Sequence, residues 1–548
     1  MQITNRNAAL ACVAILSACS TKPNVEIDEA LAAITEENLQ ATTSYLADDA
    51  REGRLVGSPG HEDAARYVAQ QFEELGLQPG GDDGFYQHVP LVTATIDADN
   101  SGVVLHMEAG DVELEWLEGA VVYPGALREQ SRVRAEVVFA GYGIHAPELG
   151  YSDFEDIDVE GKIVATLRGG PETFAPAELS YYSSIRAKEA ELVSRGAVAQ
   201  ILIWSREKKE DQTWEDYYAG YPKEPILAWQ NESGGASHYH SQQIELAGIN
   251  RNTAEKLFAD SPLTFEAALD AAEESRPVST ALGVEVTLFQ RSRHERFASP
   301  NVIGILPGSD PQLKSEFIVI TAHLDHAGTK ESDEGDTIYN GFYDNAMGVA
   351  VMLESARALS KLTVAPRRST LFLATTAEEA HWLGADYFVN NQPLPDISLV
   401  ANVNVDGSML LFPMNTITTW GAERTNFDTA AAAEVAHEGF EARPFPYPGE
   451  ESDINRSDNY PFALQGIPFI WMMEGVGSSD LTVDGLALIN AYYDDHYHQV
   501  SDDLSQPVHW DTARRFARAC ARVTHRLGMD DDAPMWNEGD FFGEKFTF

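Results

Sequence analysis

The second half of the chain, from about residue 299 to about residue 528, alternates short apolar runs with longer stretches that carry apolar residues at helical spacing. Short apolar runs bounded by turn residues are typical of buried strands. Strands that alternate with amphipathic helices favour an α/β fold, in which helices sandwich a mostly parallel sheet. The expected strands are 302–306, 317–322, 370–375, 399–405 and 468–472, and the expected helices are 346–361, 382–391, 427–438 and 510–527.

The first half has a different pattern. Residues 31–74 repeat apolar positions at helical spacing, whereas residues 103–287 consist of short runs in which apolar and polar residues alternate. This alternation predicts a β-rich module with one clear helix, 184–194. A chain of 548 residues is longer than one hydrophobic core usually serves, so two or three domains are expected.

Composition excludes several classes of partner. The chain has 38 Lys and Arg residues against 86 Asp and Glu residues, a formal net charge of −48. Nucleic-acid binding is not expected, because neutralising phosphates requires a basic face. Attraction to an anionic membrane surface is excluded on the same ground. The acidity is interpreted as a means of solubility.

The first 19 residues have the features of an export signal. Arg6 precedes an apolar stretch, and the segment ends in Leu-Ser-Ala-Cys19, which resembles the bacterial lipobox. Cleavage there would leave Cys19 as a lipidated N-terminus, and Ser20 suggests, by resemblance, the outer membrane of a Gram-negative bacterium. A plain signal peptide is the alternative. Only Cys520 would remain besides Cys19, so no intrachain disulfide is expected.

Residues able to bind metals follow the predicted strands. The strand at 317–322 ends in His323-Leu-Asp325-His326 and Asp344 opens the next helix. Another strand ends in Glu378-Glu379. Asp406 follows a third strand, and His498 lies late in the chain. A single His at a strand end or Asp before a helix is more often structural or an N-cap. The repetition changes this, because the carboxyl ends of parallel strands meet at one sheet edge.

This set of two imidazoles and several carboxylates suits two zinc ions, which take His nitrogen and carboxylate oxygen as ligands. Two such ions can share one carboxylate and one water, and a glutamate beside that water can act as general base. The adjacent Glu378 and Glu379 fit a division between base and ligand. The alternative is that these residues are helix caps and surface charges, but so many like charges would repel one another without metal.

The motifs AHLDH, DNAMG, EE, NVD and YHQVSD, in this order, resemble those of the co-catalytic dizinc aminopeptidases. That superfamily also contains glutamate carboxypeptidases, glutaminyl cyclases and non-catalytic transferrin receptors. The stretch GYGIHAPELGYSDFEDIDVEGKIVATLRG resembles an inserted protease-associated domain. The resemblance implies a bacterial lipoprotein with these segments: 1–19 signal peptide, 28–110 peptidase domain, 111–289 protease-associated insert, 290–528 peptidase domain with the catalytic residues, and 529–548 acidic tail.

The resemblance also implies roles for individual residues. His323, Asp344 and Asp406 would bind one zinc ion; Asp344, Glu379 and His498 would bind the other, with Asp344 bridging. Glu378 would be the general base, Asp325 would orient His323, and Tyr497 would stabilise the oxyanion. A cis peptide between Asp344 and Asn345 is implied, and His326 receives no ligand role; it is expected to be structural or to line the pocket.

The expected activity is that of an anchored metallo-aminopeptidase, which removes N-terminal residues from peptides through a zinc-bridging hydroxide. A dizinc carboxypeptidase or dipeptidase is the first alternative, since Arg456 could bind a substrate carboxylate. A binding protein on the same fold is less favoured, because every ligand position is filled. A glutaminyl cyclase is disfavoured by the insert. The sequence does not determine the oligomeric state.

Overall fold

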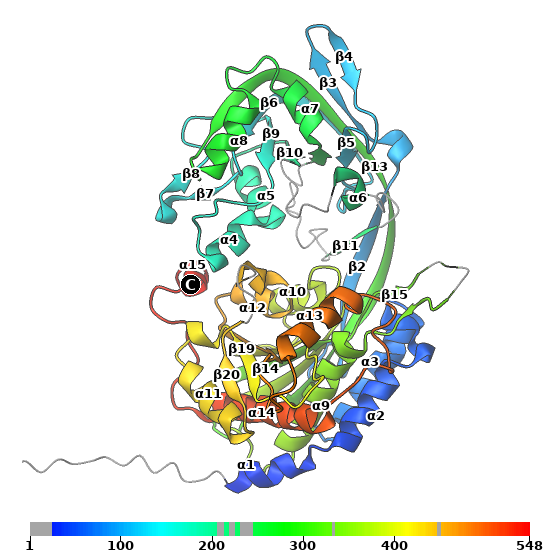
Figure 1. Ribbon diagram of the computed structural model, residues 1–548, viewed down its shortest axis with the longest axis vertical. Helices are drawn as coiled ribbons and strands as arrows, with labels where there is room; N and C mark the ends of the chain where they lie inside the picture. The colour runs from blue at the N-terminus through cyan, green and yellow to red at the C-terminus, as the bar shows by residue number, and fades with distance from the viewer. Residues whose placement is uncertain are drawn as a thin grey trace, which may run out of the picture.

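The computed structural model describes residues 25–204, 213–218, 225–230, 245–330, 332, 335–445 and 451–547. The described residues form two main β-sheets that share one strand, with the predicted site motifs in the lower part of the molecule and the β-rich module above it (Figure 1). Within the described residues, no helix combines the length and apolar character needed to cross a bilayer.

The lower sheet is mixed, with a parallel centre. Strands β17, β14, β18 and β21 run parallel to one another, and antiparallel strands flank them on both sides. Its order is β11 (Ile226–Trp229), β2 (Tyr86–Ile96), β13 (Ser279–Leu306), β17 (Ser369–Thr375), β14 (Glu316–His323), β18 (Ser398–Val405), β21 (Phe469–Glu474), β19 (Thr416–Trp420) and β20 (Glu441–Arg443). The predicted α/β class is confirmed.

Helices cover both faces of this sheet because side chains alternate along each strand. In β14, Ile318 and Ile320 join the core beneath one set of helices, while Phe317 and Val319 join the core on the opposite face. The first set contains α2 (Glu36–Leu46), α3 (Pro59–Glu74), α9 (Met347–Leu359), α11 (Asp428–His437) and α14 (Trp510–Met529). The second contains α10 (Leu383–Asn390) and α12 (Asn459–Ala463).

Strand β13 connects the two sheets. Its first part, up to Arg291, pairs with strands of the upper sheet, and from Ser292 onward it pairs with strands of the lower sheet. Buried and exposed side chains alternate over most of its first part, whereas residues 299–305 are all buried, as expected of a central strand covered on both faces. The sequence predicted only the last five residues of this strand.

The upper sheet belongs to the β-rich module. Its order is β4 (Gly110–Glu113), β3 (Gly102–Met107), β13, β6 (Gln130–Ala140), β9 (Ile163–Leu167), β10 (Ala199–Ile203), β12 (Glu245–Ile249) and β5 (Ala120–Val122). Since β3 and β4 pair here, this sheet starts before residue 111, the boundary expected from the sequence; the division into domains itself stays a prediction.

Helices of the upper module were underpredicted. The expected helix 184–194 is α5 (Ile185–Ser194), but α4 (Pro176–Ser183), α7 (Arg251–Leu257) and α8 (Phe265–Glu273) are also present. These helices are at most nine residues long, too short to show several turns of helical periodicity. α7 and α8 cover one face of the sheet.

The acidic C-terminal segment packs on both parts of the molecule. Its helix α15 (Phe541–Phe546) lies near α4 and α12 (Figure 1). It buries Phe541 and Phe542 in an aromatic cluster, together with Tyr182 of α4 and Tyr460 of α12. Beside this contact, Arg186 of the upper module lies 3.1 Å from the buried Asp386 of α10. The two parts therefore share a packed interface in addition to strand β13.

A buried carboxyl in the upper module makes stability depend on pH. Burial, together with nearby Glu245, raises the pKa of Glu189 on α5 to about 8. Between about pH 4.5 and 8 the unfolded chain releases this proton and the folded protein retains it, so the free energy of unfolding falls as pH rises. Glu189→Gln is therefore expected to increase that free energy at pH 8 by roughly 1–3 kcal/mol.

Urea denaturation at pH 5 and pH 8 measures this effect. The increase in the free energy of unfolding caused by Glu189→Gln should be smaller at pH 5, because there Glu189 of the unfolded chain is still partly protonated. The exposed Glu155 of the same module provides a matched control, and Glu155→Gln should leave the pH dependence unchanged. An equal gain from Glu189→Gln at both pH values would contradict the expectation.

Candidate metal centre

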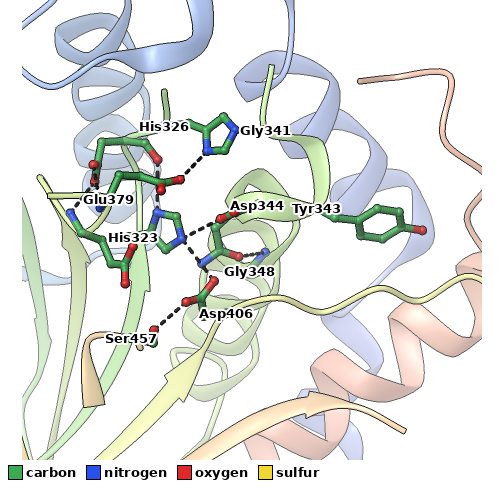
Figure 2. Close-up of polar contacts among 12 residues, drawn as sticks. His323, His326, Gly341, Tyr343, Asp344, Gly348, Glu379, Asp406 and Ser457 are labelled. Carbon is green, nitrogen blue, oxygen red and sulfur yellow. Dashed lines mark hydrogen bonds and ion pairs between the residues drawn. The ribbon is translucent and has the colours of Figure 1, made fainter. Parts of the chain in front are cut away.

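The predicted ligands come from neighbouring parallel strands and meet at one edge of the lower sheet. His323 is the last residue of β14, Glu378 and Glu379 follow β17, and Asp406 follows β18. The three strands are adjacent and parallel, so their carboxyl ends lie side by side. Figure 2 shows His323, Asp344, Glu379 and Asp406 pointing toward one another.

Asp344 lies at the centre of the cluster. Its Oδ1 is 3.0 Å from Nε2 of His323, and its Oδ2 is 3.1 Å from Nε2 of His498. Asp406 Oδ1 lies 3.1 Å from the same His323 nitrogen, and Glu379 Oε2 lies 3.3 Å from His498 Nε2. One carboxylate thus separates two groups of ligand atoms, each with one imidazole and one further carboxylate.

These donors fit zinc in type and in protonation. Within each of two sets the donor atoms lie within 4.8 Å of one another: His323, Asp344 and Asp406 in one, and His326, Asp344 and Glu379 in the other. His323 Nδ1 is 3.1 Å from the backbone carbonyl of Asp325, which can only accept, so Nδ1 carries the proton and Nε2 is free to bind a metal.

Asp325 makes a different contact from the one expected. The carboxylate accepts hydrogen bonds from the backbone N–H groups of Glu378, at 3.1 Å, and Glu379, at 3.4 Å. Only its backbone carbonyl contacts the ring of His323. Asp325 therefore holds the segment that carries the predicted base and ligand, because the chain after β14 turns its side chain toward the end of β17.

The backbone of Asp344 is held from the late YHQVSD motif. Asp502 is fully buried and accepts hydrogen bonds from the N–H groups of Tyr343, at 3.1 Å, and Asp344, at 3.2 Å. The peptide bond between Asp344 and Asn345 is cis, as expected. Residues about 160 positions apart therefore fix the central carboxylate.

A buried arginine supports the cluster from behind. Arg54 is 1% exposed, and its guanidinium donates to the backbone carbonyls of Leu46, Leu324, Asn340 and Gly341 at 2.6–3.0 Å. Burial lowers its pKa to about 10, so it remains charged at neutral pH. The Arg54 side chain thus connects the loop after β14 with the loop before Asp344 through hydrogen bonds, and it places one positive charge next to the carboxylates of the cluster.

Buried carboxyl groups crowd the cluster. Burial raises the pKa of Asp325 and Asp502 to about 6 and that of Asp458 to about 7. It also raises the pKa of Glu378 well above the usual range, with a further increase from Asp406 and other nearby carboxylates. Carboxylates buried this densely disfavour one another's ionised form, and divalent ions would relieve the repulsion. The residues present thus fit a metal centre.

A cavity of about 460 Å³ opens beside the ligands. Glu378, Asp344, Asp406 and His498 form part of its wall. Tyr497 lines it as well, with its ring stacked on that of His498 at 3.9 Å between centroids. The remaining lining residues are Gly407, Trp420, Phe445, Asp453, Arg456, Trp471, Met473, Asn490, Tyr493 and Asp494.

The structure therefore brings together all the predicted residues except Cys19, which lies outside the described residues. Three supporting residues were not given roles from the sequence: Arg54, Asp458 and Asp502. They lie in the short stretches EGR (52–54), SDN (457–459) and YHQVSD (497–502) respectively. The residues next to them in the sequence do not mark them as supporting residues.

Comparison with known proteins agrees with the arrangement of the ligands. Residues 301–524 match the profile of Peptidase family M28. The matched segment contains every predicted metal ligand and Glu378. Leupeptin-inactivating enzyme 1 of Streptomyces exfoliatus is 25% identical over 241 residues, which cover 43% of this chain and 50% of that protein. The chain thus spans about half the length of this relative.

Two solved structures also align with this chain. The aminopeptidase of Aneurinibacillus sp. strain AM-1 aligns with a TM-score of 0.49 and 19% identity, over 93% of this chain and 97% of that chain. The zinc aminopeptidase BSAP of Bacillus subtilis aligns with a TM-score of 0.39 and 20% identity, over 90% of this chain and 94% of that chain.

Proposed function

We propose that this protein is an exported, lipid-anchored aminopeptidase that uses two zinc ions to remove N-terminal residues from peptides. The observation that carries the proposal is the position of Asp344, whose two oxygens face the imidazoles of His323 and His498 at 3.0 and 3.1 Å. His323 and Asp406 would hold one ion, Glu379 and His498 the other, and Asp344 both.

Zinc bound at these residues supplies a Lewis acid for the scissile carbonyl and lowers the pKa of a water molecule. Glu378 faces the cavity beside the ligands and accepts the proton of the attacking water; it then returns this proton to the leaving amine. Burial raises the pKa of Tyr497, so its hydroxyl keeps its proton and can donate to the developing oxyanion.

The cavity lining supports recognition of a free amino terminus. Asp494 adds negative charge to a wall that already contains the ligand carboxylates, and this favours a cationic α-amine. The remaining wall is largely apolar: Trp420, Phe445, Trp471, Met473 and Tyr493. A large apolar or aromatic first residue is therefore the expected substrate side chain.

Arg456 supports the alternative of a carboxypeptidase or dipeptidase, since it also lines the cavity. However, its guanidinium lies 3.4 Å from the Asp453 carboxylate, which offsets its charge. Peptides blocked at the N-terminus and free at the C-terminus distinguish the two activities, because only a carboxypeptidase cleaves them.

The direct test measures metal content and activity of the same sample. We expect the protein beginning after Cys19 to contain about two zinc ions per chain by elemental mass spectrometry. It should also release p-nitroaniline from leucyl and phenylalanyl p-nitroanilides much faster than from the glutamyl compound. A chelator should abolish the release and added zinc should restore it. Absence of metal and of activity after zinc addition would refute the proposal.

Export and anchoring rest on the first 19 residues alone. Expression of the whole chain in a Gram-negative host should yield a membrane-associated form, and Cys19→Ala should release it from the membrane. Labelling with a radioactive fatty acid is the measurement, and the Cys520→Ala variant is the control because Cys520 is fully buried. Equal labelling of the Cys19→Ala variant would contradict anchoring at this residue.

A further inference from the structure

His326 is a third imidazole at the metal centre, and the family resemblance implied no ligand role for it. It is 1% exposed, and its Nδ1 lies 2.5 Å from Oε1 of Glu379. Figure 2 shows this contact on the side of Glu379 away from Asp406. The other ring nitrogen, Nε2, is buried and has no hydrogen-bond partner among the described residues.

The ring of His326 is held in a tight position. Gly341, at φ +58°, packs against it so closely that a Cβ atom there would lie 2.7 Å from the ring carbons. The backbone N–H of His326 donates to the carbonyl of Arg54 at 3.3 Å. The orientation of the imidazole is therefore restricted, and Nδ1 is the ring nitrogen that faces Glu379.

The contact determines which atom carries the proton. An ionised carboxylate only accepts hydrogen bonds, so Nδ1 of His326 donates to Oε1 of Glu379. The second oxygen, Oε2, lies 3.3 Å from Nε2 of His498, the other predicted ligand of the same ion. With Oε1 engaged by His326, Oε2 is the oxygen that faces the ligand cluster.

We propose that His326 is a positioning residue that holds the Glu379 carboxylate by Oε1, so that Glu379 presents the single oxygen Oε2 to the second metal ion. This inference rests on the proposed dinuclear site. Hydrogen bonds to ligating carboxylates fix their orientation, and loss of such partners typically lowers metal affinity by about 10- to 100-fold. The effect is confined to the site that contains Glu379 and His498.

Two variants separate the hydrogen bond from packing. In His326→Asn the side-chain amide can place a donor where Nδ1 lies, whereas His326→Leu fills a similar volume without a donor. With a competing chelator, His326→Leu should bind one zinc ion as the wild type does and the second about 10- to 100-fold more weakly. His326→Asn should stay within a few fold of the wild type for both ions.

His525→Asn, a substitution of a buried imidazole on α14, provides the control and should change neither affinity. If His326→Leu does not fold, His326→Gln takes its place, because its longer side chain carries the amide near the position of Nε2 rather than Nδ1. Wild-type affinity for both ions in either variant without the donor would overturn the inference.

X-ray absorption spectroscopy of the zinc-loaded protein tests whether His326 is itself a ligand. A positioning role predicts an average of one imidazole per zinc ion, from His323 and His498, unchanged in His326→Asn. An average of one and a half that falls in this variant would make His326 a ligand and overturn the inference. A wild-type protein that binds fewer than two ions would instead refute the dinuclear site itself.

Discussion

Replacement of Glu378 by glutamine is expected to reduce kcat by about 10³-fold or more while both zinc ions remain bound. The amide has nearly the same shape as the carboxylate, but it cannot accept the proton of the attacking water. Glu378 lines the cavity and belongs to neither of the two metal-binding groups, so its loss removes the base without removing a ligand.

Parallel measurement of kcat and metal content tests this expectation. The adjacent Glu379→Gln is the matched control, since it alters a predicted ligand and should lower the zinc content. His498→Ala should lower it too. Equal metal loss in Glu378→Gln and Glu379→Gln would contradict the division between base and ligand at this pair.

Asp344→Asn is expected to have the largest effect on metal binding. Its carboxylate is the only one in contact with both His323 and His498 among the described ion pairs, so an amide weakens both groups of ligands at once. We expect less than one zinc ion per chain and activity reduced by about 10⁴-fold or more, because two ions are required for the chemistry.

Asp494→Asn serves as the control for this substitution. Asp494 lines the same cavity but belongs to neither metal-binding group, so this variant should retain two ions and change mainly KM for the amino-terminal substrate. Retention of two ions in Asp344→Asn, measured by elemental mass spectrometry after dialysis, would exclude a bridging role.

Strand ends were the part of the site that the sequence predicted best. β14, β17 and β18 are largely apolar and mostly buried, and His323 ends β14, Asp406 follows β18 directly and Glu378 lies three residues after β17, so pattern and chemistry coincide. Helix α13 (Gly485–Asp495), which forms one wall of the cavity, was not predicted. Its buried residues Gly485, Ile489 and Tyr492 follow helical spacing, but the exposed Leu486 and Leu488 place apolar residues outside that face and obscure the pattern; its cap, Asp484, was the available signal.

Contacts between distant residues could not be predicted from local pattern. Arg54 donates to carbonyls nearly 290 residues later, and nothing in the EGR motif specifies these partners. Similarly, the expected contact between the Asp325 carboxylate and the His323 ring depended on the direction that the chain takes in the two residues after β14. The side chain turned toward the backbone of Glu378, whose N–H otherwise lacks an acceptor at the strand end.

Strand β13 has a mechanical consequence. A joint between two bodies normally consists of a few residues whose dihedral angles absorb a rotation. Here the link is a strand of 28 residues, paired with β2 from Ser292 to Val302, where it passes between the sheets. Rotation of the two sheets relative to each other would have to break the hydrogen bonds between β13 and β2, so the connection resists bending along its whole length. Helix α4 contacts the segment Glu451–Asn455, which carries the cavity-lining Asp453, so the position of the upper module bears directly on the wall of the cavity.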